Sequence, residues 1–131
     1  MLERLAQAFA AQDAAGVAAT LADDVTLRVA VHDEPFEGAA GARQILETVL
    51  DGVLHDIAVG ETIGGGDAAA VLFTAQVASR PGAADGLLVV RPADGGPIAD
   101  LTVFLRPLGA LQELAAEMGR RLGTPKPTGM P

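Results

Sequence analysis

The sequence predicts an α+β domain in which N-terminal helices pack on a strongly curved, mainly antiparallel sheet and a C-terminal helix follows the last strand. Three observations lead to this expectation. Apolar residues recur at helical spacing through much of the first half, whereas apolar and polar residues alternate in the second half. Turn signals rich in glycine and proline separate the alternating runs. The length fits one domain, which we place at residues 1–122.

The first half is expected to contain three helices and one long strand. Leu5 and Phe9 belong to the apolar stripe of an amphipathic first helix. Asp13 can cap a second, shorter helix, which stops before Asp23-Asp24. Gly52 is placed to end the third helix. The expected elements are helices over residues 2–12, 14–22 and 39–51, a strand over 25–32 and a brief strand at 36–37.

The second half is expected to be a sheet of four strands followed by a helix. The last strand shows the alternation most clearly, because Leu101, Val103 and Leu105 occupy every second position. Pro107 lacks a backbone donor and ends this strand. The expected elements are strands over 54–63, 68–79, 86–91 and 98–106, turns at 64–67, 81–82 and 94–96, a helix over 108–122 and a disordered tail over 123–131.

Composition excludes several classes of protein. A formal net charge of −8 argues against binding to nucleic acid or to anionic membrane surfaces, since like charges repel. The chain has no cysteine, so disulfides and thiolate metal sites are excluded. The N-terminal residues include acidic and amide side chains where a signal peptide needs an apolar run, so we expect a soluble, cytoplasmic protein.

The chain resembles the nuclear transport factor 2-like superfamily, particularly its SnoaL-like branch. The resemblance rests on the order of three segments: FAAQDAAGVAATLADDVTL near the start, EPFEGAAGARQIL in the middle and DGGPIADLTVFLRPL at the end. It covers residues 2–122 and implies a cone whose bent sheet wraps helices around a pocket, with homodimers formed through the outer sheet face. The family includes ketosteroid isomerases, polyketide cyclases, epoxide hydrolases and members of no known activity, so the fold does not supply the function.

The resemblance also indicates where catalytic groups would lie, and this chain has aliphatic residues at those positions. In the isomerases the general base corresponds to Val29, the oxyanion-hole tyrosine to Leu5 and the protonated aspartate to Leu88. In the SnoaL-type cyclases the general acid/base corresponds to Val103. An aliphatic side chain neither transfers a proton nor stabilises an enolate. The Asp–Arg–Asp set of the epoxide hydrolases has no convincing equivalent.

The same correspondence assigns the two faces of the sheet. The inward positions are nearly all aliphatic, so the resemblance implies an apolar pocket whose ligand-binding residues are Val29, Leu88, Val90, Leu101 and Val103. Thr74 and Gln76 either offer polar contacts inside this pocket or lie at an interface. The outer face is mixed and polar with one phenylalanine, as suits an isologous homodimer, and it carries Arg28, Asp100, Thr102, Phe104 and Arg106.

His55 is the main candidate for chemistry. It is one of two histidines, and the alternation of its strand places it on the face of Ile57 and Val59. A neutral histidine that faced the cavity would shuttle a proton near pH 7, whereas a histidine at the rim or surface would not.

The other charged candidates have simpler interpretations. His32 followed by Asp33-Glu34 suggests a metal site, but a solvated loop is favoured, and we expect no metal and no cofactor. Asp100 is either a buried acid or an outward partner of Arg28 or Arg106, and the outward partner is favoured.

Three functions remain, in this order. The first is a homodimeric domain that binds a small apolar molecule in the cone, or has only a filled core, and does no chemistry. The second is an isomerase or polyketide cyclase-like enzyme that uses His55 as general base, with Thr74 or Gln76 orienting a carbonyl. The third is an assembly or interaction module without a pocket.

Overall fold

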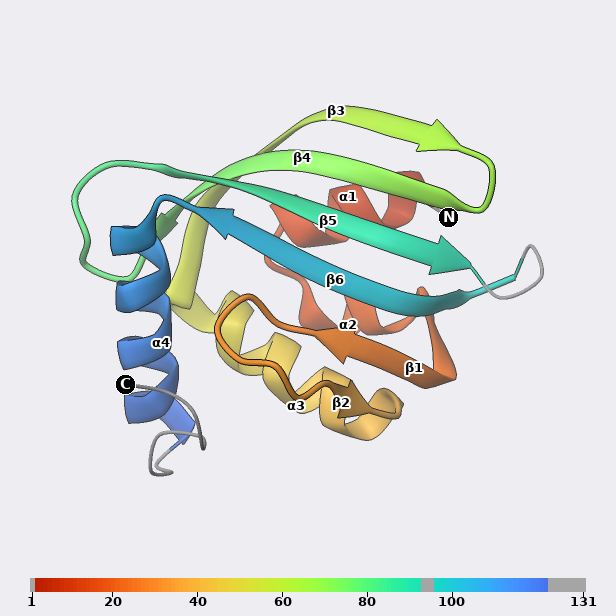
Figure 1. Ribbon diagram of the computed structural model, residues 1–131, viewed down its shortest axis with the longest axis horizontal. Coiled ribbons are helices and arrows are strands. Elements are labelled where there is room, and N and C mark those ends of the chain that lie inside the picture. Colours follow the sequence, from red (N-terminus) through yellow and green to blue (C-terminus); the bar gives the residue numbers. More distant parts are fainter. Residues whose placement is uncertain (1, 93–95, 123–131) are drawn as a thin grey trace.

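One curved sheet with helices against its inner face makes up the domain. The computed structural model describes residues 2–92 and 96–122 (Figure 1). The helices are α1 (Leu2–Ala10), α2 (Ala14–Ala18), α3 (Ala39–Thr48), the π-helical turn η1 (Val49–Val53) and α4 (Leu108–Leu122). The strands are β1 (Leu21–Arg28), β2 (Phe36–Glu37), β3 (Leu54–Gly65), β4 (Ala68–Val77), β5 (Ala84–Pro92) and β6 (Ile98–Arg106).

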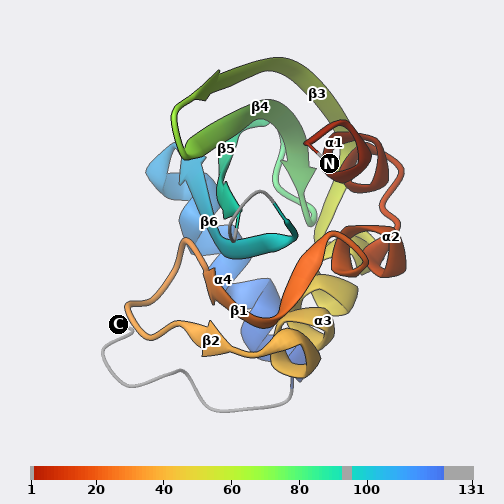
Figure 2. The same cartoon turned by 90° about the vertical axis from the view of Figure 1, so that its right-hand side faces the viewer.

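The sheet is mainly antiparallel, as the sequence predicts. Within the described residues its six strands have the order β2-β1-β6-β5-β4-β3. The strands β3 to β6 follow one another as antiparallel neighbours, while β1 lies parallel to β6. In Figure 2 the strands form an arc, and α1, α2 and α3 close its inner side. This arrangement is the predicted α+β cone with a C-terminal helix.

Two irregularities in β3 contribute to the bend of the sheet. The pairing of β3 with β4 shifts between His55 and Ala58 and again between Val59 and Thr62. Asp56 lies at the first shift with φ of 50°, in the left-handed region. Each shift inserts an extra residue into β3, and such bulges bend a strand and increase its local twist.

The inner face of the sheet forms the core. Along β4 every second residue is buried, including Val71, Phe73 and Val77, as the alternation predicts. The ring of Phe73 packs edge-on against Phe9 of α1, with 4.8 Å between ring centroids. Gly86 leaves room for this ring, because a Cβ at Gly86 would lie 2.2 Å from it. The first helix is thereby fixed to the middle of the sheet.

The prediction for the first strand is wrong in its position. The helix α2 ends at Ala18, and β1 begins at Leu21, four residues earlier than expected. The amide of Ile98 donates to the carbonyl of Thr20, so the chain enters the sheet directly after α2. The residues Asp23-Asp24 are exposed positions within the strand, and they do not mark a helix end. After Arg28 the chain leaves the sheet, so residues 29–32 form a loop.

The other elements lie close to their predicted positions. Asp13 caps α2 by accepting a hydrogen bond from the Gly16 amide at 3.0 Å. The third helix continues as the turn η1, in which Gly52 has φ of 89°. The predicted disordered tail at 123–131 and most of the predicted turn at 94–96 lie outside the described residues.

The described helices are too short or too polar to span a membrane.

Candidate functional site

A small, largely enclosed cavity lies inside the cone, between the helices and the inner face of the sheet. Its volume is about 50 Å³. Helices, strands and the loop after β1 all contribute apolar side chains to its wall. The lining residues are Leu5, Phe9, Val17, Leu27, Val29, Ala30, Ile45, Leu46, Val49, Leu54, Leu88, Leu101, Val103 and Leu114.

The structure brings together the four positions at which the resemblance places catalytic groups. Leu5 of α1, Val29 after β1, Leu88 of β5 and Val103 of β6 all line this one cavity. Their side chains carry no atom that can donate or accept a proton, and the rest of the lining is equally apolar. The cavity can therefore hold an apolar molecule by packing, but its wall offers no group for acid–base chemistry.

The size of the cavity restricts what it can hold as it stands. A volume of about 10–15 Å³ suffices for one water, but this wall offers a water no hydrogen-bond partner. Pockets for drug-sized ligands have about 300–1,000 Å³. A cavity of about 50 Å³ is thus suited to a few apolar atoms, and a larger molecule requires part of the wall to move.

The predicted ligand-binding residues divide between the two faces of the sheet. Four of them line the cavity: Val29, Leu88, Leu101 and Val103. Val90 is buried in the core but does not line the cavity. Thr74 and Gln76 lie on the other face. The residues paired across β4, β5 and β6 show this, since Thr74 pairs with Asp85 and Asp85 pairs with Arg106. The structure therefore places Thr74 and Gln76 away from the cone cavity.

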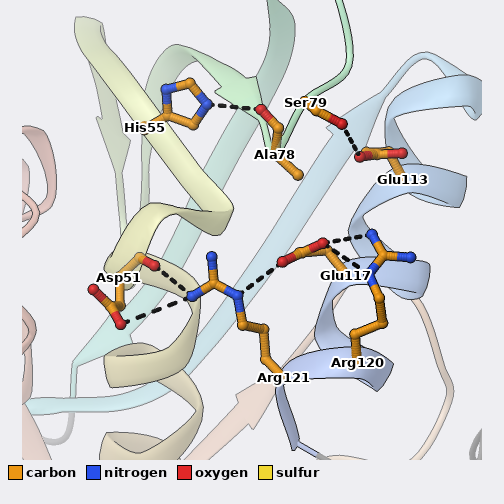
Figure 3. A network of polar contacts seen from close by, with 8 residues as sticks. All are labelled: Asp51, His55, Ala78, Ser79, Glu113, Glu117, Arg120 and Arg121. Carbon is orange, nitrogen blue, oxygen red and sulfur yellow. Dashed lines mark hydrogen bonds and ion pairs between the residues drawn. The ribbon is translucent and has the colours of Figure 1, made fainter.

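His55 is also absent from the wall of the cavity. Figure 3 shows it beside the backbone of Ala78. His55 pairs with Gln76 at the start of β3, on the outer face. Its Nε2 lies 2.9 Å from the carbonyl oxygen of Ala78, and its Nδ1 lies 2.8 Å from a carboxylate oxygen of Asp56. Both partners are acceptors, so the two contacts together require a proton on each nitrogen. The Ala78 carbonyl and then the Asp56 carboxylate raise the pKa of His55 above its ordinary value.

A wider hollow of about 710 Å³ lies on the outer face of the sheet and opens to solvent. Its apolar floor includes Leu72, Leu87 and Phe104, which are neighbours across β4, β5 and β6. Its polar side includes Arg106, whose guanidinium donates to the Asp85 carboxylate at 2.8 Å. Sequence reasoning missed Asp85 and the two leucines, although the pairing of alternate residues across adjacent strands could have located them.

The predicted outer-face residues do lie on that face. Arg28 pairs with Asp100 at 3.1 Å, and Thr102 donates to the same carboxylate. Asp100 is thus an outward partner of Arg28, as favoured from the sequence. Phe104 is 52% exposed and Ile63 is 57% exposed, so this face presents large apolar side chains to solvent.

The loop that carries His32 shows no sign of a metal site. The imidazole of His32 packs edge-on against Phe36, with 5.4 Å between ring centroids. Across residues 2–92 and 96–122, no three histidine, cysteine, aspartate or glutamate side chains are grouped as metal ligands would be.

Known proteins with a SnoaL-like domain or a similar fold match most of this chain. A family model described as the SnoaL-like domain matches residues 2–106. A steroid delta-isomerase from Pseudomonas aeruginosa is 33% identical over 93% of this chain and 88% of its own, with a TM-score of 0.83. A protein with a cystatin-like fold from Silicibacter pomeroyi DSS-3 is 24% identical over 94% of this chain and 85% of its own, with a TM-score of 0.85.

A third solved structure shares the fold at lower identity. SalBIII, an epoxide hydrolase/cyclase-like enzyme with a role in pyran ring formation in salinomycin, is 18% identical, with a TM-score of 0.66. The alignment covers 80% of this chain and 87% of that one. A search of curated proteins gave no match.

Proposed function

The chain belongs to the SnoaL-like family, and we propose that it is a non-catalytic, homodimeric member that binds a small apolar molecule in its cone. One observation carries the proposal. Leu5, Val29, Leu88 and Val103 converge on a single cavity whose lining is entirely apolar. A cytoplasmic location and the absence of a cofactor or metal remain predictions from the sequence.

The apolar lining defines the chemistry of the ligand. A polar group taken into this cavity would lose its hydrogen bonds to water and find no partner in the wall, at a cost of about 1–3 kcal/mol. A hydrocarbon surface has no such penalty and gains packing contacts. The buried part of the ligand is therefore a saturated or aromatic hydrocarbon group.

Isomerase activity is the alternative that the Pseudomonas aeruginosa relative raises. Three features count against it here. The cavity offers no base, it is far smaller than a steroid, and His55 lies on the opposite face of the sheet. We expect neither turnover of a steroid enone precursor above the uncatalysed rate nor any effect of His55→Ala on such turnover.

The outer face supports the homodimer. The described residues include three large apolar side chains that are exposed, and two of them, Ile63 and Phe104, lie on this face. Phe104 forms part of the hollow. The ion pairs Arg28–Asp100 and Arg106–Asp85 lie on the same surface as these apolar groups. An apolar centre with polar surroundings is typical of a subunit interface.

Xenon is the first probe for the cavity, because it enters small dry cavities and needs no hydrogen bond. Methyl NMR spectra of leucine and valine would be recorded under xenon pressure. We expect shifts for the methyl groups of Leu5, Leu88 and Val103. The methyl groups of Leu72 and Leu87 on the outer face are the internal control and should not shift. Shifts confined to the outer face, or none at all, would contradict the binding proposal.

A further inference from the structure

The helix α4 closes one end of the cone. It follows β6 directly and stands across the end of the sheet at which β6 finishes (Figure 1). Its buried side chains are Ala110, Leu114 and Met118, and Leu114 forms part of the cavity wall. All other lining residues belong to the chain before residue 106. A displacement of α4 would therefore remove Leu114 from the wall without moving the other lining residues.

Few polar contacts attach α4 to the rest of the domain. Three of its 15 residues are buried, and Leu111 and Leu122 are partly buried against the core. Among the described residues, its polar contacts with other elements come from two side chains (Figure 3). Arg121 donates to the carbonyl oxygen of Asp51 at 2.6 Å, and Glu113 accepts a longer bond of 3.4 Å from Ser79. The remaining ion pairs, from Arg120 and Arg121 to Glu117, lie within α4 itself.

The surface on which α4 rests is held in shape without it. The side chain of Gln12 donates to the carbonyl oxygens of Leu50, within the turn η1, and of Leu54, directly after it, at 3.1 Å each. The amide of Ala78 donates to the carbonyl oxygen of Val53 at 2.7 Å. These bonds give hydrogen-bond donors to backbone carbonyl oxygens in and next to the irregular turn, and the donors belong to elements other than α4.

Several residues with positive φ lie in or near the turn η1, on which α4 rests. Gln12, Asp56 and Ala78 have φ of 56°, 50° and 47°, and Gly52 in η1 has φ of 89°. Side chains other than glycine are strained in this region and persist only where surrounding contacts hold them. The hydrogen bonds of Gln12 and Ala78 supply part of that support to the turn η1 from elements other than α4.

We propose that α4 is a movable lid, and that its displacement admits hydrocarbon groups too large for the closed cavity. The proposal rests on the apolar-ligand function proposed above. The ligand takes the place that Leu114 leaves, so that it packs against Leu88, Leu101 and the other walls while α4 stays displaced. Arg121 sets how often the lid opens, because its contact with Asp51 must break each time.

Two neighbouring arginines allow a matched test. Arg121→Gln removes the contact with Asp51 and an ion pair with Glu117, whereas Arg120→Gln removes only an ion pair with Glu117. Hydrogen exchange measured by mass spectrometry on the full chain, without ligand, reports the opening of α4. We expect exchange of the α4 amides to be about five-fold faster in Arg121→Gln than in wild type, with little change in Arg120→Gln.

Cyclohexane tests admission of a molecule larger than xenon. We expect cyclohexane to shift the NMR signals of the Leu88 methyl groups and to bind Arg121→Gln about five-fold more tightly than wild type. We also expect it to speed hydrogen exchange of the α4 amides while the β5 amides stay protected. Three results would each overturn the lid. The first is an equal cyclohexane affinity for wild type, Arg121→Gln and Arg120→Gln, and the second is exchange of the α4 amides only on global unfolding. The third is binding of xenon without any binding of cyclohexane. If xenon shifts no methyl group of the cavity wall in wild type, the proposed ligand-binding function is overturned. The rate of hydrogen exchange in α4 still shows, in that case, whether α4 opens.

Discussion

Leu87 and Leu88 are neighbours in β5, yet they lie in different regions of the molecule. Leu88 is 1% exposed and lines the largely enclosed cavity of about 50 Å³, whereas Leu87 borders the open hollow of about 710 Å³ on the other face. The larger hollow contains charged groups and the smaller cavity has none. Size and polarity alone would direct attention to the outer hollow. The positions at which the resemblance places catalytic groups nevertheless line the small cavity, which the helices help to enclose.

The largest expected difference between the two faces is in stability. Leu88→Ala removes a buried side chain from a closely packed wall, and we expect the free energy of unfolding to fall by about 2–5 kcal/mol. Leu87→Ala should lower it by less than about 1 kcal/mol in the monomer, because Leu87 is only partly buried. Urea unfolding at low protein concentration measures both. Similar losses for the two variants would contradict the assignment of the faces.

The second difference concerns assembly. Phe104→Glu places a charge in the centre of the proposed interface, and we expect the dimer dissociation constant to rise by at least about 30-fold, with unfolding of the monomer little affected. Analytical ultracentrifugation measures the association. Leu108→Glu is the control, since Leu108 is 68% exposed but belongs to α4 and not to the sheet. A wild-type protein that stays monomeric at high concentration, or equal effects of the two variants, would refute this interface.

Much of this contrast between the faces could be predicted from the sequence. The alternation of Leu101, Val103 and Leu105 gives the inner face of β6, and the structure keeps that order. Regular alternation succeeds there because β6 pairs with β5 without a shift from residue 100 to residue 106. The sequence also predicts that Leu5, Val29, Leu88 and Val103 face one apolar pocket, and all four line the cavity.

The position of His55 could not be predicted in the same way. Alternation assigns His55 to the face of Val59, but the extra residue at the shift between His55 and Ala58 reverses that relation. His55 therefore shares the outer face with Ala58, while Val59 pairs with the inward Phe73. A bulge with Asp56 at φ of 50° has no clear signal in the sequence, because aspartate is equally typical of turns and helix caps. The same limit affected the start of β1, where exposed aspartates resembled a helix end.

The smallest expected effect is the dependence of stability on the charge of His55. Its pKa in the folded protein is raised above about 6.5 by the Ala78 carbonyl and the Asp56 carboxylate. The protonated form is therefore favoured by folding, so its contribution is fully present below the pKa of the unfolded chain and is lost as the pH rises through the folded pKa. Because His55 and Asp56 are partly or largely exposed, we expect a contribution below about 1 kcal/mol.

Urea unfolding of wild type and His55→Gln at about pH 5.5 and about pH 8 isolates this effect. The difference between the two proteins should be larger at the lower pH, whereas His32→Gln, which removes the other histidine, should show no comparable change. A larger difference at the higher pH would mean that the neutral imidazole is the form held in the fold. His55 would then donate to only one of its two acceptors, and its availability as a base on the outer face would have to be reconsidered.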